Sequence, residues 1–424
     1  MAEATGLAVP QVVHLSRVIG GELWNNEGGK LGRVDDLIVR LGEDEYPPVS
    51  GLLATVAGRQ VYVPADSVSE IGHGRTTLRR VRLDLRPFDR RPQEVLLKKD
   101  VLDRQLISLN GARLVRSNEI ELARLDGWYR VVGVDVGLRG FARRLLPRAF
   151  ADSIRPTSFL DWATVEPFTG HVPTVRLKIP HPKLAKLHPA QLADLVEAAS
   201  HSQGEEIIEA VGDDPELEAD VFEELEKSHQ LEFLEERSDS DVAELMARME
   251  SDDAADLVAA LPEDRQETVI EHLPPVQRRR VRALLGFDPA TAGGLMSPDF
   301  VCVYSQATHA EALARVRTSH AAHDALTWVF VMNAHKSLEG AIALADLLRA
   351  DPDLSLAEVA GVPQSVQADA DLEEVARLMT DYDLTAVPVC DPEQHMLGVI
   401  TVDDVLELVL PRSWRRRFGL FGED

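Results

Sequence analysis

The sequence is poor in cysteine and in long apolar runs, and each shortage excludes a class of protein. Two cysteines in 424 residues are too few for a disulfide framework and favour a reducing compartment. No apolar run approaches the roughly 20 residues that cross a bilayer, and the N-terminus lacks a basic flank followed by an apolar stretch. We therefore expect a cytoplasmic chain that is not exported by a signal peptide and forms no membrane pore by itself.

Sequence signatures of catalysis are also missing. The chain has no Gly-x-Ser-x-Gly, no Walker loop, no Cys-x-x-Cys and no His-Glu-x-x-His, the spacings that place a nucleophile, a phosphate cradle, a redox pair or a metal-bound water. Its 13 histidines are scattered along the chain. We therefore predict that the protein is not an enzyme.

Basic residues are outnumbered, because 45 Lys and Arg face 71 Asp and Glu, a formal net charge of -26. This balance argues against a nucleic-acid partner. Residues 1–180 hold 26 basic and 22 acidic residues, whereas 205–267 hold 24 acidic residues and four basic ones. The asymmetry predicts units with different partners. Packing the acidic segment must overcome self-repulsion, which divalent cations would relieve.

Residues 11–180 have the pattern of β-structure. Short alternating runs at 37–41, 52–56, 60–63 and 77–83 are separated by Gly and Pro, and a second passage repeats this at 105–109, 112–115 and 127–132, with Asn110-Gly111 as a hairpin turn. The turn-to-strand segments 28–36 and 110–118 correspond. The two halves resemble PRC-barrel domains, small β-barrels related to the reaction-centre H subunit, and we predict one at 11–90 and another at 92–168. The resemblance implies docking modules.

From residue 184 the apolar spacing becomes helical. Four units of about 12 residues start at Ser238, Glu250, Pro262 and Pro274; several of them open with Ser, Asp or Pro, which suit a helix start. Helices of about ten residues are marginal alone. We therefore expect them to stack in series as a small superhelix, within a helical domain at 181–287.

Two stretches make a resemblance specific. Met249-Glu-Ser-Asp-Asp-Ala-Ala-Asp-Leu257 and Leu284-Leu-Gly-Phe-Asp-Pro-Ala-Thr-Ala-Gly-Gly-Leu-Met-Ser-Pro298 resemble the cytosolic N domain of MgtE-type magnesium channels, where it runs into a CBS pair. The resemblance covers about 184–410. It implies an acidic helical domain that lies against two CBS motifs, with Mg²⁺ bridging the acidic faces.

Two CBS motifs are expected, at 288–354 and 355–411. The second is predicted to contain a helix at 372–382, strands at 386–390 and 397–401, and a helix at 402–410. Its Gly398-Val-Ile-Thr-Val-Asp-Asp404 resembles the family pattern in which a hydroxyl meets a phosphate and an Asp holds a ribose. The resemblance therefore assigns an adenine-nucleotide site, ATP included, to Thr401, Asp404 and Ala386.

Two observations limit this nucleotide assignment. The first motif keeps Asp346 but has Ala343 where the hydroxyl belongs, so at most one good site is expected. In the second motif Thr401 and Asp404 also suit a plain helix start, with Thr as N-cap and an acid in the first turn. The sequence leaves both interpretations open.

The predicted magnesium site consists of carboxylates. Asp252 and Asp256 stand at i and i+4 on one helical face, and the resemblance places acids near the second CBS motif opposite them, with Asp371, Asp383 and Asp403 as candidates. Mg²⁺ keeps much of its water and needs only one or two carboxylates per site. The alternative is that these residues are first-turn or solvated acids.

The end of the sequence departs from the channel family. Where an acidic connecting helix would begin, residues 412–424 are basic and aromatic, which suits an anionic membrane surface or a membrane protein; a solvated terminus is the alternative. Residues 139–150 mix Arg with Phe and Leu, and suit either a membrane surface or a helix that caps a barrel. A CBS pair also implies a homodimer.

The sequence thus predicts a multi-domain α+β protein with two PRC-like β-barrels, an α-helical superhelical domain and a tandem CBS pair. We expect a cytoplasmic magnesium-sensing regulator, peripheral at the inner face of the membrane, that acts on a separate membrane ion transporter. The alternative is a metal-independent structural adaptor or dimerisation scaffold.

Overall fold

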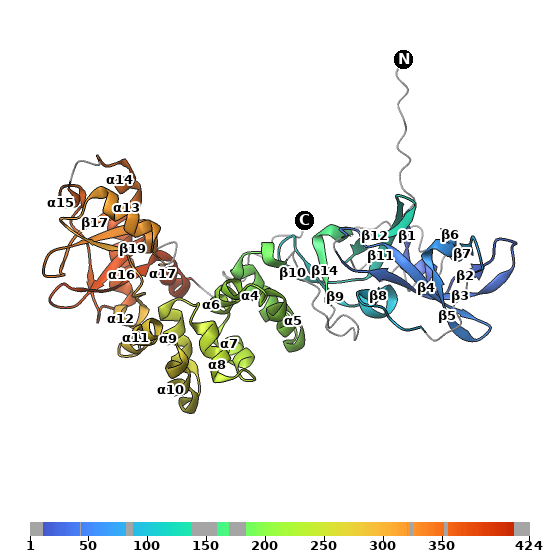
Figure 1. Cartoon of the computed structure of the whole chain (residues 1–424), viewed down its shortest axis with the longest axis horizontal. Coiled ribbons are helices and arrows are strands. Elements are labelled where there is room, and N and C mark those ends of the chain that lie inside the picture. The colour runs from blue at the N-terminus through green and yellow to red at the C-terminus, as the bar shows by residue number, and fades with distance from the viewer. Residues whose placement is uncertain are drawn as a thin grey trace, which may run out of the picture. The chain divides into compact units, whose positions relative to one another are not determined.

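The computed structural model describes residues 12–42, 44–81, 88–137, 159–168, 184–319, 321, 325–351 and 355–410. The chain divides into two compact units, Met1–Asp213 and Asp214–Asp424, and each is described by itself (Figure 1). The basic segments predicted at 139–150 and 412–424 lie outside the described residues.

The first unit is built mainly from three sheets. The largest has the order β5-β4-β3-β2-β7-β6, with β8 also paired to β3; the others are β1-β11-β12-β13 and β10-β9-β14. Its strands are β1 (Val13–His14), β2 (Glu22–Trp24), β3 (Lys30–Arg40), β4 (Val49–Val56), β5 (Arg59–Pro64), β6 (Val68–Ile71), β7 (Arg75–Leu78), β8 (Glu94–Leu96), β9 (Gln105–Ser108), β10 (Arg113–Arg116), β11 (Glu119–Leu125), β12 (Trp128–Asp135), β13 (Phe159–Asp161) and β14 (Val165–Pro167).

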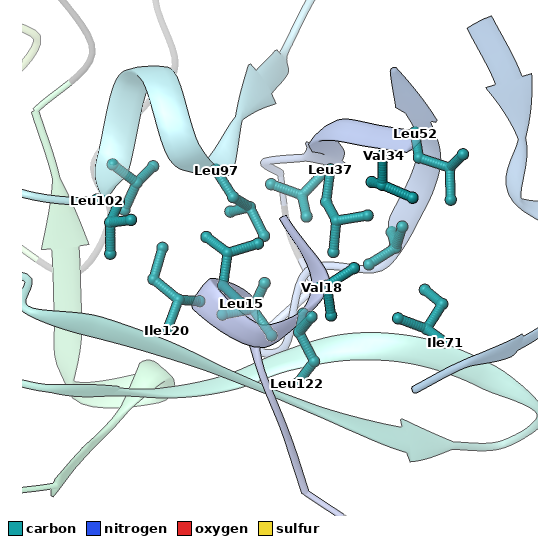
Figure 2. Packing of buried hydrophobic residues seen from close by; sticks show 14 of the residues in the cluster. Leu15, Val18, Val34, Leu37, Leu52, Ile71, Leu97, Leu102, Ile120 and Leu122 are labelled. Carbon is teal, nitrogen blue, oxygen red and sulfur yellow. The ribbon is translucent and has the colours of Figure 1, made fainter. Parts of the chain in front are cut away.

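One large hydrophobic core joins both halves of this β-structure, and a smaller separate cluster lies in β3, β4, β5 and β8. The large core includes Leu15, Leu37, Leu97 and Ile120, each almost wholly buried, from both halves of the sequence repeat (Figure 2). Short helices α1 (Leu15–Val18), η1 (Ala65–Ser67), η2 (Leu97–Val101) and η3 (Trp162–Thr164) connect the strands. The expected β-fold is present, but among the described strands no sheet closes into a barrel, because each strand order is an open path.

Helices follow the sheets in the sequence. The first unit ends with η4 (Leu184–Lys186), α4 (Pro189–Ala198) and α5 (His201–Val211). The second unit begins with α6 (Pro215–Glu224), α7 (Lys227–Leu234), α8 (Asp239–Met246), α9 (Ser251–Ala260), α10 (Glu263–His272), α11 (Pro275–Leu284) and α12 (Ala292–Leu295). The 12-residue repeat thus gives α8 to α11, which contact one another in an alternating way: α8 with α10 and α9 with α11.

Two small α/β modules complete the second unit. The first contains β15 (Cys302–Tyr304), α13 (His309–Arg317), η5 (Ala325–Thr327), β16 (Trp328–Met332), β17 (Leu338–Ala343), α14 (Leu344–Arg349) and α15 (Leu356–Val359). The second contains β18 (Val366–Gln367), α16 (Leu372–Tyr382), β19 (Ala386–Cys390), β20 (Met396–Thr401) and α17 (Val402–Val409). In each sheet the first pair of strands is parallel and the second antiparallel. The helix and strands predicted at 372–401 are confirmed.

Candidate functional site

The candidate site lies where the start of α9 meets the second α/β module. Glu250 is the N-cap of α9, and Asp252 and Asp253 stand in its first turn. Acids are favoured there because the free backbone amides and the helix dipole attract negative charge. This preference explains why two adjacent Asp residues can start a helix that is otherwise made mainly of Ala, Leu and Val.

The segment 296–299 holds the helical domain against that module. Ser297 is buried and pairs through its backbone with Val399 of β20, at 2.8 Å in both directions. Asp299 accepts a hydrogen bond from the Ser251 hydroxyl at 3.0 Å and forms a 2.7 Å ion pair with Arg280 of α11. The beginning of α9 is therefore fixed beside the end of β20.

This packing brings Asp252 close to an acid of the opposite module. Burial raises the pKa of Asp252 to about 7, with a contribution from the charge of Asp404 in α17 and a smaller one from Asp299. The Ser297 hydroxyl and the helix backbone lower it in part. Near neutral pH this carboxyl group therefore gains from either a proton or a cation.

Two further carboxyl groups share this environment. Burial raises the pKa of Asp253 well above its ordinary value, and Asp252, Glu223 and Asp404 add to the effect. Burial also raises the pKa of Glu223 in α6 to about 7, although its carboxylate accepts a 2.6 Å hydrogen bond from the Glu250 amide. We call Glu223, Asp252, Asp253 and Asp404 the acidic interface.

The predicted nucleotide residues are adjacent in space. Thr401 ends β20 and is the N-cap of α17; its amide and hydroxyl both donate to the Asp404 carboxylate. Ala386, which begins β19, lies opposite Thr401 in the antiparallel pairing. The helix-start interpretation is therefore realised in this structure. Asp404 belongs both to this cap and to the acidic interface.

The five predicted metal residues are not brought together. Only Asp252 lies in the acidic interface. Asp256, one turn further along α9, forms a 2.6 Å ion pair with Lys227. Asp371 caps the start of α16 by accepting from the Glu374 amide at 2.8 Å, and Asp383 ends the same helix in a left-handed conformation.

Helix geometry separates Asp371 from Asp383. Residues at the two ends of α16 are about 18 Å apart at 1.5 Å per residue, so the pair cannot share one ion. Asp403 is exposed in the first turn of α17, next to Asp404. Sequence reasoning thus missed Asp253, Glu223 and the position of Asp404 in the acidic interface. Only the density of acids in 205–267 pointed towards the first two.

The donor set suits a hard divalent cation that keeps its water. All four side chains of the acidic interface offer carboxylate oxygens, which Mg²⁺ and Ca²⁺ prefer. Within the described ranges no group of three or more His, Cys, Asp or Glu residues could hold a metal ion. A site with one or two direct carboxylates and several waters fits this arrangement, whereas a zinc-type cage does not.

A separate open cavity of about 450 Å³ lies in the first unit. It is lined mainly by strand ends of two sheets, and includes Tyr62, Arg91, Trp128 and Arg130. Arg91 lies over the Tyr62 ring and pairs with Glu94, while Arg130 pairs with Asp44. Because both guanidinium groups have carboxylate partners, the cavity has no cationic excess that would select an anion.

Comparison with known proteins identifies the second half of the chain. The family model described as the MgtE intracellular N domain matches residues 187–290, and the CBS domain model matches 292–353 and 358–411. Residues 187–411 are an MgtE intracellular N domain followed by a CBS pair. The acidic interface therefore lies between the MgtE N domain and the second CBS motif.

Curated relatives and a solved structure agree with these family matches. "Magnesium transporter MgtE" of Thermus thermophilus is 40% identical over 139 residues, which cover 32% of this chain and 31% of the relative. Its namesake in Enterococcus faecalis is 32% identical, with 34% and 32% covered. The crystal structure of the cytosolic domain of the Mg²⁺ channel MgtE in complex with ATP is 32% identical, with TM-score 0.50, and covers 53% of this chain and 92% of that one.

The match is partial in length. The chain spans about a third of the curated relatives it matches. In the part of the chain that the structure describes, no helix combines the length and hydropathy of a membrane span.

Proposed function

We propose that the second unit is a regulatory magnesium sensor, and that the acidic interface is its sensing element. The observation that carries this proposal is the proximity of Asp252 to the charge of Asp404 across two domains, which contributes to the raised pKa of Asp252. Two like charges at a buried contact disfavour the packed arrangement unless a proton or cation neutralises them. The magnesium transporters and the Mg²⁺ channel structure among the relatives support Mg²⁺ as that cation.

The mechanism is a population shift. At low Mg²⁺, repulsion among Asp252, Asp253, Glu223 and Asp404 favours separation of the helical domain from the CBS pair. At high Mg²⁺ the ion binds the packed form better than the separated one, so the packed form dominates. The direct bonds of Ser251 and Arg280 to Asp299 keep the two surfaces in register when they close.

An adenine nucleotide is the second proposed ligand, with Thr401, Asp404 and Ala386 as its residues. The ATP complex of the MgtE cytosolic domain supports it. Binding would require the Thr401 hydroxyl and the Asp404 carboxylate to exchange their mutual hydrogen bond for bonds to phosphate and ribose. No step of this proposal is catalytic, so the protein acts by binding.

The remaining roles follow from the domain order. We propose that the protein works in the cytoplasm on a separate membrane ion transporter, that the PRC-like β-structure of the first unit docks it there, and that the CBS pair forms a homodimer. The second candidate function is a metal-independent adaptor. Four of the predicted metal residues have surroundings that favour this adaptor. Asp256 pairs with Lys227, and the other three are exposed: Asp371, Asp383 and Asp403.

Calorimetric titration with MgCl₂ separates the two functions. We expect the full chain to bind Mg²⁺ at micromolar to about 10 mM concentrations, since few-carboxylate sites are weak. Asp252→Asn should weaken binding about tenfold or more, because it removes a ligand and its charge. Asp256→Asn, on the same helix but paired with Lys227, is the matched control and should bind like the wild type. Absence of binding up to about 20 mM in the wild type would leave only the adaptor.

A further inference from the structure

The two halves of the β-structure exchange their first strands. We define repeat 1 as residues 13–78 and repeat 2 as residues 94–167. Strand β1 of repeat 1 pairs with β11 of repeat 2, with Val13 opposite Leu122. Strand β8 of repeat 2 pairs with β3 of repeat 1, with Val95 opposite Val39. The register shifts at a β-bulge between Ile38 and Val39 in β3 and between Glu121 and Leu122 in β11, so Val39 corresponds to Leu122 in the structure. Val13 and Val95 each stand two residues before the first helical leucine, so the same pairing occurs twice in the same register.

The helices that follow these strands are capped reciprocally. In repeat 1 the Ser16 amide of α1 donates to the Glu119 carboxylate of repeat 2 at 3.0 Å. In repeat 2 the Lys98 and Lys99 amides of η2 donate to the Asp36 carboxylate of repeat 1 at 2.8 and 3.1 Å. Ser16 and Lys98 are both the second residue of their helix, so these caps are again one contact made twice.

Both capping carboxylates are buried, so each depends on the donors that the other repeat supplies. Asp36 is 4% exposed and Glu119 is 0% exposed. A buried carboxylate needs donors to offset its desolvation, and for each of these two acids some of the donors come from the other repeat. Neither repeat could bury its acid at the same cost without the helix that its neighbour supplies.

The apolar contacts follow the same exchange. Leu15 of α1 is fully buried and packs over β11, which carries Ile120 and Leu122 (Figure 2). Leu97 of η2 is also fully buried and packs against β3, which carries Leu37. Each repeat therefore contributes its short helix to a core that it shares with the other repeat.

We propose that residues 13–167 are one strand-exchanged unit and not two domains that dock side by side. Each repeat offers an open strand edge that ends at a buried carboxylate, and the occupant that fits this surface is the first strand and short helix of the other copy of the repeat. The two repeats consequently fold, persist and dock to a partner as one body. This proposal is independent of magnesium and of the CBS pair.

Cleavage between the repeats tests the proposal in the full chain. A protease recognition sequence placed within residues 82–87 allows the chain to be cut after folding. We expect the two fragments to remain a 1:1 complex in native mass spectrometry and gel filtration, because two strand pairings and one core hold them. Separation of the fragments without denaturant would overturn the proposal.

Hydrogen exchange of the uncut chain tests the reciprocity directly. Asp36→Asn should deprotect the Lys98 and Lys99 amides about tenfold or more while Ser16 stays protected. Glu119→Gln should do the opposite, deprotecting Ser16 alone. Asp66→Asn, an exposed first-turn acid of η1, should change neither. If each variant affected only the helix of its own repeat, or both helices equally, the exchange would be refuted.

Discussion

At the residue scale, two aspartates of one helix show how surroundings decide the role of a side chain. Asp252 and Asp256 lie one turn apart in α9. Asp256 faces Lys227 at 2.6 Å and has a half-exposed side chain, which makes an ordinary surface ion pair of little energetic weight. Asp252 faces Asp404 and the buried Ser297 instead. Only Asp252 of these two is therefore placed to couple the two domains through its charge.

The raised pKa of Asp252 makes stability depend on pH with a defined sign. Its ordinary pKa of 3.8 rises to about 7 in the folded chain, so the folded state holds the proton more tightly than the unfolded state. The proton on Asp252 therefore adds to the free energy of unfolding, fully below about pH 4, and this addition is lost as the pH rises to about 7. Each difference of one in pKa between the folded and unfolded states corresponds to about 1.4 kcal/mol. We expect the stability advantage of Asp252→Asn over the wild type to grow from pH 4 to pH 8 in EDTA.

Urea unfolding of both proteins at several pH values measures this difference. Asp256→Asn should follow the wild-type pH dependence, since it leaves the acidic interface intact. An Asp252→Asn curve that stays parallel to the wild type from pH 4 to pH 8 would show that Asp252 is well solvated and would remove the charge argument.

Thr401 offers a second residue-scale prediction. Thr401→Val keeps the shape of the side chain but removes the hydroxyl, and a hydrogen bond to a charged group contributes about 1.5–3 kcal/mol. ATP affinity should therefore fall about tenfold or more. Thr401→Ser retains the hydroxyl and should bind nearly as the wild type does. Equal ATP affinity in all three proteins, measured by calorimetry, would assign Thr401 to helix capping alone.

At the element scale, close packing at one glycine fixes the CBS pair to the segment before it. A Cβ atom at Gly398 in β20 would lie 2.7 Å from the Met296 side chain and from the Ser297 carbonyl oxygen. Gly398→Ala should therefore destabilise the second unit by about 1–3 kcal/mol. At Gly361 the nearest atom is 3.8 Å away, so Gly361→Ala is the control. Thermal unfolding that is equal for both variants would contradict this packing.

Regular elements were predictable where pattern and burial agree. The 12-residue repeat predicted α8 to α11 because each helix starts with a capping or first-turn residue and buries the same positions, such as Leu245 and Leu257. The hairpin around Asn110-Gly111 was also confirmed, since β9 and β10 pair antiparallel across it. In these segments local preference and core packing favour the same structure.

Elements whose pattern lacked a buried face were not predictable. A strand was expected at 77–83, but β7 ends at Leu78 and Val81 is 53% exposed. The Arg79 amide pairs instead with the Ser67 carbonyl at 2.7 Å.

The strand exchange was equally hidden, because it depends on contacts between residues far apart in the chain, such as Ser16 and Glu119. The correspondence between segments 28–36 and 110–118 aligned Asp36 with Asn118 in sequence. In the structure it is Glu119 that, like Asp36, accepts hydrogen bonds from the helix of the other repeat. A match of turns and strands fixes the order of elements, but the acid that caps the neighbouring helix is decided by packing between the repeats.

At the scale of the whole molecule, the part of the chain with the excess of acidic residues is also the part that contains the proposed ligand sites. The described part of the nearly balanced residues 1–180 is mainly β-structure, whereas the strongly acidic region 205–267 precedes the CBS pair. Of the five predicted magnesium residues, only Asp252 lies in the acidic interface. Asp404, which lies there with it, was predicted to bind a nucleotide. Which acids meet across two domains depends on tertiary packing, and no spacing in the sequence encodes it.

A ligand that binds only one unit should stabilise only that unit. If Mg²⁺ binds the folded acidic interface, a concentration of about 100 times its dissociation constant adds about 2.7 kcal/mol to the free energy of unfolding. For a unit the size of Asp214–Asp424, that corresponds to an increase in Tm of about 5–10 °C. Scanning calorimetry should show this increase in one transition while the transition of the first unit stays in place.

Two comparisons make the calorimetric result decisive. Asp252→Asn should abolish most of the increase in Tm, and NaCl at matched ionic strength should not reproduce it, because screening of exposed charges differs from occupation of a buried site. Equal increases in both transitions would indicate a general salt effect. An increase retained in Asp252→Asn would locate the ion elsewhere, and the charge contact between α9 and α17 would then contribute to packing without sensing Mg²⁺.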